Sequence, residues 1–191
     1  WVSNDGHWVV FYASGKQEDL FVVRTDGTGL RQLTDDIHRD RGPRWSPDGK
    51  RIAFYSNRGG QYEIWSINAD GSGLQQLTFN SPSLASHPVW SPDGTRLAFN
   101  APLGGSFIVE VDKAGKEAPR AMPPMPDRAE PFRAWSWSPD GQWIAGYRQR
   151  PDGSSSGVSI YNVAGQRYEH LTESGEAPVW LNDSRRLLFQ N

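Results

Sequence analysis

Residues 153–157, Gly-Ser-Ser-Ser-Gly, match by letters the G-x-S-x-G turn that presents a serine nucleophile. Such a turn needs a strand before the serine, a helix after it, and an aspartate and a histidine farther along an α/β sheet. Here Pro151-Asp152-Gly153 opens a serine- and glycine-rich tract, and no helical period follows. We therefore interpret the segment as a flexible loop, and we predict that this chain has no catalytic residue and is not an enzyme.

Asp36, His38 and Asp40 carry the side chains of a metal site, because carboxylates and imidazoles are common metal ligands. The chain has 4 histidines, and none has a ligand spacing. We predict neither a metal nor a cofactor. Arginines recur in the same irregular segments, and their convergence would favour an acidic or carboxylate-bearing partner. These arginines are Arg39, Arg41, Arg44, Arg58, Arg128 and Arg133.

A repeat must position these residues. WSPDG occurs at 45–49, 90–94 and 137–141, and the sequences TDGTGLRQLT (25–34) and ADGSGLQQLT (69–78) recur in the same register. Tryptophans at the aligned position are spaced by roughly 43 to 47 residues, a period typical of propeller repeats. The five units start near Trp1, Trp45, Trp90, Trp137 and Trp180, and the first and last are degenerate.

Each unit divides into four short segments in which aromatic and β-branched residues alternate with polar ones. In the second unit these segments cover 42–45, 51–55, 62–67 and 74–78. We predict an all-β fold, a β-propeller of four-stranded antiparallel blades with about four and a half blades. It forms a single domain over residues 1–191 that belongs to a longer chain. The ring is expected to be incomplete, because the first unit supplies little of its innermost strand and the last unit ends after its first two strands.

The WSPDG letters have a structural explanation. Proline at the second turn position, aspartate at the third and a glycine that accepts a left-handed conformation predict a tight hairpin. The tryptophan is expected to bury its large ring between neighbouring blades, and Trp8, Trp65, Trp135 and Trp143 are expected to do the same. The repeat therefore indicates scaffold and not a site.

Composition excludes several classes of function. With 20 basic and 22 acidic residues there is no global field to attract a polynucleotide. No apolar run approaches the roughly 20 residues of a membrane span, so no membrane insertion is expected. The absence of cysteine excludes disulfides and thiolate sites.

The letters WSPDG, KRIAF, Ile64-Trp65, NADG and QQLT closely resemble the TolB-type β-propeller repeat, a relative of WD-repeat blades. The resemblance covers essentially the whole chain and is clearest over residues 35–78 and 79–123. This sequence differs from TolB in lacking the preceding α/β domain and a full set of six blades. The resemblance implies a periplasmic or otherwise extracytoplasmic location and a protein or peptide partner.

Strand parity separates two faces. The uniform SPDG and DG turns occupy one face, and the irregular two-to-three loops and blade connections occupy the other, where binding usually resides. We count His87 among the predicted binding residues because it lies just before an innermost strand. The predicted binding residues are Asp36, His38, Asp40, Arg41, Arg58, His87, Arg128 and Arg133.

Three functions are compatible with these features. The first is a non-enzymatic scaffold for protein-protein interaction. The second is the propeller of a prolyl-oligopeptidase-like peptidase or a polysaccharide lyase whose catalytic residues lie outside this chain. The third is the extracytoplasmic sensor domain of a signalling protein.

Overall fold

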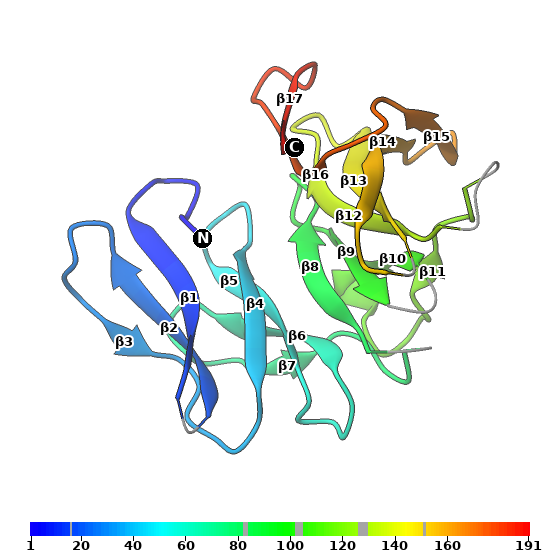
Figure 1. Cartoon of the computed structure of the whole chain (residues 1–191). Helices are drawn as coiled ribbons and strands as arrows, with labels where there is room; N and C mark the ends of the chain where they lie inside the picture. Colours follow the sequence, from blue (N-terminus) through cyan, green and yellow to red (C-terminus); the bar gives the residue numbers. More distant parts are fainter. Residues whose placement is uncertain (16, 82–83, 102–104, 126–129, 151) are drawn as a thin grey trace.

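The computed structural model describes residues 1–15, 17–81, 84–101, 105–125, 130–150 and 152–191. The chain forms five antiparallel sheets in sequence order, and the one helical element among the described residues is the 3₁₀ turn η1 (Val111–Lys113). Each sheet is a meander of consecutive strands (Figure 1). The first two sheets contain β1 (Trp8–Ser14), β2 (Glu18–Arg24) and β3 (Arg31–Gln32), then β4 (Asp40–Trp45), β5 (Arg51–Ser56), β6 (Glu63–Asn68) and β7 (Gln75–Gln76).

The later sheets continue the pattern. The third and fourth contain β8 (Ser86–Trp90), β9 (Arg96–Ala101), β10 (Gly105–Glu110) and β11 (Arg120–Ala121), then β12 (Phe132–Trp137), β13 (Trp143–Gln149), β14 (Ser155–Asn162) and β15 (Arg167–His170). The fifth contains β16 (Glu176–Trp180) and β17 (Leu187–Gln190). In the first sheet the innermost strand is reduced to a bridge between Val2 and Val9. The all-β fold and the partial blades are as predicted, and the described sheets do not close a ring.

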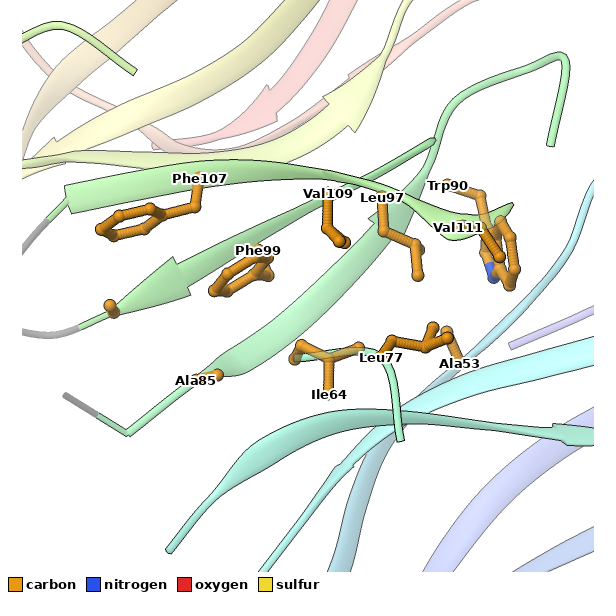
Figure 2. Packing of buried hydrophobic residues seen from close by; sticks show 11 residues of the cluster. Ala53, Ile64, Leu77, Ala85, Trp90, Leu97, Phe99, Phe107, Val109 and Val111 are labelled. Atoms are coloured by element: carbon orange, nitrogen blue, oxygen red, sulfur yellow. The ribbon is translucent and has the colours of Figure 1, made fainter. Parts of the chain in front are cut away.

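The hydrophobic core lies between neighbouring blades. Ile64 of β6 and Leu77 face Leu97 and Phe99 of β9 and Val109 of β10 in one buried cluster (Figure 2). These side chains alternate along their strands with residues of the opposite face, which is why a period of two recurs in the sequence. Because apolar burial contributes about 25 cal/mol per Å², the interface between blades is the main source of stability.

The repeat tryptophans join each blade to the one before it. The Nε1 atoms of Trp45, Trp90 and Trp137 donate to the carbonyls of Trp1, Arg44 and Val89, each at 3.1 Å. Trp90 and Trp137 are also covered by guanidinium groups of the preceding blade. Those groups belong to Arg51, 5.1 Å from the ring centroid of Trp90, and Arg96, 4.9 Å from that of Trp137. The predicted packing between blades is confirmed and includes a specific hydrogen bond.

The SPDG segments are hairpin turns, as predicted. The amide of Gly49 donates to the carbonyl of Ser46 at 2.9 Å, and the Ser46 hydroxyl donates to Asp48 Oδ1 at 2.6 Å. Asp48 also accepts from the amide of Lys50. The same bonds recur in the turns at residues 91–95 and 138–142. The motif is therefore a self-contained turn and carries no chemistry of its own.

Gly49→Val is expected to lower the free energy of unfolding by about 1 kcal/mol or more. Gly49 has a φ of +68°, and no atom lies within 4 Å of the position of an added Cβ, so the cost comes from the backbone conformation alone. Urea unfolding followed by tryptophan fluorescence measures it. Lys50→Val, one residue later, is the matched control, and equal midpoints for the two variants would contradict the explanation.

Candidate functional site

The innermost strands β4, β8, β12 and β16 each contain a β-bulge. The pairing register shifts between Arg41 and Arg44, Ser86 and Val89, Ala134 and Ser136, and Glu176 and Val179. In three of these strands the bulge holds a residue of positive φ directly before a proline. These residues are Gly42 (φ 59°), His87 (φ 52°) and Ala177 (φ 52°). Bulges re-aim side chains, and innermost strands line the axis of a propeller.

Five rings form a continuous series across three blades, which we call the aromatic row: Tyr62, Tyr55, His87, Trp135 and Tyr147. Consecutive centroids lie 5.6, 5.4, 6.2 and 6.0 Å apart. His87 is exposed and the other four are half-buried. His87 and Trp135 come from the bulges of β8 and β12, and both rings lie at the inner strands outside the buried apolar clusters.

Cationic groups accompany the aromatic row. Arg44 of β4 is half-buried, and its guanidinium lies 3.5 Å from the ring centroid of Trp1. Burial lowers the pKa of Arg44 to about 10, which leaves it charged at neutral pH.

Although His87 keeps an exposed surface, its imidazole is partly desolvated beside the rings of Tyr55 and Trp135. This desolvation, followed by the positive charges of Arg44 and Arg133, lowers the pKa of His87 below its ordinary value. The imidazole is therefore mostly neutral at pH 7.

Three of the predicted binding residues form a separate cluster. Arg58 Nη1 lies 3.0 Å from Asp36 Oδ2, and Arg58 Nη2 lies 2.6 Å from Asp40 Oδ2. The side chains of Arg58 and Asp40 are 8% and 0% exposed. The guanidinium also lies over the rings of Phe54 and Trp65. This burial is typical of a structural ion cluster, so the Arg58 side chain is directed into the protein although the residue belongs to the irregular loop between β5 and β6.

The other predicted residues lie in different environments. The amide of His38 donates to Asp36 Oδ1 at 2.8 Å. Arg41 makes a two-pronged ion pair with Glu18, whose carboxylate holds the pKa of Arg41 above its usual value. Arg133 is buried and donates to Gln149 Oε1 at 2.8 Å, whereas Arg128 lies outside the described residues. Within the described ranges, no three acidic or histidine side chains gather as metal ligands would.

Sequence reasoning missed most of the aromatic row. Tyr55 and Tyr62 fall within the strand segments predicted at 51–55 and 62–67, and no feature of the sequence singles out Tyr147. Trp135 was expected to pack like the repeat tryptophans, and it does bridge two blades, but through His87 and outside the buried clusters. The sequence does contain a feature that locates the bulges, because each bulge residue precedes the repeat tryptophan of its unit by two or three positions.

The G-x-S-x-G segment belongs partly to a strand. Residues 155–157 lie in β14, which continues to Asn162, so the flexible-loop interpretation is wrong for these residues. The Ser155 hydroxyl donates to the carbonyl of Gly175 at 2.5 Å, and that of Ser156 donates to the Glu130 carboxylate. A strand where the nucleophile turn requires a helix rules out that geometry.

Successive antiparallel meanders joined by buried tryptophans define part of a β-propeller. The family model described as the TolB beta propeller domain matches residues 2–124, and the chain belongs to this family.

Solved structures share the fold. A putative TolB from Agrobacterium tumefaciens superposes with a TM-score of 0.77 at 21% identity, over 100% of this chain and 73% of that one. TolB from Acinetobacter baumannii gives a TM-score of 0.68 at 23% identity, over 92% of this chain and 43% of that one. Dipeptidyl-peptidase 5 of Porphyromonas gingivalis is 52% identical over 42 residues, which are 22% of this chain and 6% of the peptidase. The matched regions thus cover less than half of the Acinetobacter protein and a small part of the peptidase.

Among the described residues, no helix has the length and apolar character needed to cross a membrane.

Proposed function

We propose that this chain is a non-enzymatic scaffold that binds a protein or peptide partner, in an extracytoplasmic compartment, through the aromatic row and the irregular connections beside it. The observation that supports the proposal is the set of bulges that place His87 and Trp135 at the inner strands, outside the apolar core. A residue such as His87 in a left-handed conformation costs of order 1–3 kcal/mol, and such positions cluster at functional sites. Rigid blades on both sides would hold this surface with little change on binding.

Selection from a library of random linear peptides, followed by NMR footprinting on the ¹⁵N-labelled chain, tests this function. We expect selected peptides to shift the amide signals of Tyr55, His87 and Trp135 and to leave those of Gly49 and Gly94 in the SPDG turns unchanged. The SPDG turns are the internal control, because they lie on the opposite face of every blade. Failure to select any peptide, or shifts confined to the SPDG turns, would refute the proposal.

One observation favours a second function, the propeller part of a peptidase. It is the 52% identity over 42 residues with Dipeptidyl-peptidase 5. In that case the catalytic residues would be supplied by sequence outside residues 1–191, and the inner strands would guide a peptide substrate. The sequence of the parent gene distinguishes the two functions, because a hydrolase domain joined to this propeller would support the peptidase and refute the scaffold.

A further inference from the structure

Arg44 differs in its partners from Arg41 and Arg58, two other arginines of the second blade. Arg58 pairs with Asp36 and Asp40, and Arg41 pairs with Glu18. For Arg44, the described residues supply no carboxylate within ion-pair distance. Its contacts are the carbonyl of the adjacent Pro43, at 3.2 Å from Nη1, and the face of Trp1.

A desolvated guanidinium without an anion is unfavourable, because buried charges are normally paired. The group has five N–H donors in a planar fork that matches a carboxylate. One donor is engaged by the Pro43 carbonyl, so others are available to an incoming anion. Arg44 therefore has the chemistry of a preformed carboxylate receptor.

The surroundings of Arg44 extend the positive character. The charges that act on His87 are those of Arg44 and Arg133, both cationic. Carboxylates act on the aromatic row near both ends, Glu18 on Tyr55 and Glu176 on Tyr147. Glu18 is already paired with Arg41, so the carboxylate beside Tyr55 does not supply the positive charge of Arg44 with an ion-pair partner.

The aromatic row supplies the other half of a recognition surface. Tyr55 and His87 lie 5.4 Å apart, and Trp135 follows at 6.2 Å from His87. Ring faces and edges at these spacings accept a further aromatic or flat apolar group by offset or edge contact. A ligand that suits both halves carries a carboxylate close to such a group.

We propose that Arg44, His87 and Trp135 form a subsite for an acidic residue beside an aromatic residue in a bound peptide. The proposal rests on the proposed peptide-binding function and specifies its chemistry. The peptide carboxylate pairs with the Arg44 guanidinium, and the neighbouring ring packs against His87 and Trp135. Charge complementarity favours this occupant, because the described residues supply the Arg44 guanidinium with no carboxylate partner.

The test uses the strongest peptide from the random library and its isostere in which each Asp or Glu is replaced by Asn or Gln. Titration calorimetry measures both peptides against the native chain and Arg44→Gln. We expect the native chain to lose about tenfold or more in affinity for the isostere, and Arg44→Gln to lose a similar factor for the acidic peptide. Arg44→Gln should then no longer distinguish the two peptides, since the two changes remove one interaction.

Arg51→Gln is the matched control, because Arg51 also covers a tryptophan but lies at the turn end of its strand. It should retain native affinity. If Arg44→Gln fails to fold, the difference in affinity of the native chain for the two peptides still tests the acidic subsite. Peptides that bind the aromatic row with equal affinity after amidation overturn the acidic subsite but leave the proposed function intact. If a hexamer of uronic acid binds the native chain and does not bind Arg44→Gln, the assignment of a peptide ligand to this subsite is overturned.

Discussion

Gly157→Ala is expected to lower the free energy of unfolding by about 3 kcal/mol or more, because two costs coincide. A Cβ on Gly157 would lie 1.9 Å from the carbonyl oxygen of Thr172, a backbone atom that cannot rotate away. The φ of +110° is also one that an L side chain rarely adopts. Relief would require separating β14 from the segment after β15, where the amide of Thr172 now donates to the carbonyl of Val158.

Gly153→Ala is the matched control from the same serine- and glycine-rich tract. Gly153 also has a positive φ, +87°, but no atom lies within 4 Å of its added Cβ. Its cost should be about 1 kcal/mol. Urea unfolding of both variants separates the steric cost from the backbone cost. Similar losses in the two variants would show that β14 can move away from Thr172 without penalty.

Arg58→Ala is expected to cost about 3–5 kcal/mol, because it leaves the buried carboxylate of Asp40 without a cation. Asp40 is 0% exposed, and its Oδ1 has no hydrogen-bond partner among the described side chains and backbone, so the Arg58 contact carries its compensation. The variant also removes the guanidinium from the faces of Phe54 and Trp65. The measurement is the free energy of unfolding in urea.

Arg39→Ala, an exposed arginine one residue before Asp40, should change stability by only about 0.5 kcal/mol or less. Adding Asp40→Leu to Arg58→Ala should recover part of the loss, since an apolar residue needs no cation. A loss at Arg58 no greater than that at Arg39 would mean that the ion cluster contributes nothing to the fold. With the expected loss, Arg58 is unsuitable for testing partner binding, because its substitution perturbs folding.

The repeat made the fold predictable. Turn chemistry in SPDG and the spacing of Trp45, Trp90 and Trp137 are local or periodic features, so the sequence alone indicates antiparallel blades and tryptophans between them. The structure agrees in the hairpin bonds at Gly49 and in the strand bounds of the second blade to within a few residues.

The site was less predictable, because its geometry is made by contacts between distant segments. Nothing near Arg58 in the sequence shows that Asp36 and Asp40 fold over it. Similarly, the register shift around His87 decides that this side chain meets Tyr55 and Trp135, and a register shift is set by pairing between strands. Residue type located the charged segments, whereas tertiary structure decided which of them are internal.

The hydrogen bonds of the repeat tryptophans have a direction that bears on how the protein is made. Trp45, Trp90 and Trp137 each donate to a carbonyl of the blade synthesised earlier. When a new blade leaves the ribosome, the acceptor for its tryptophan is therefore already in place. Because contacts in a repeat protein are mainly between neighbours, each finished blade can template the next during translation.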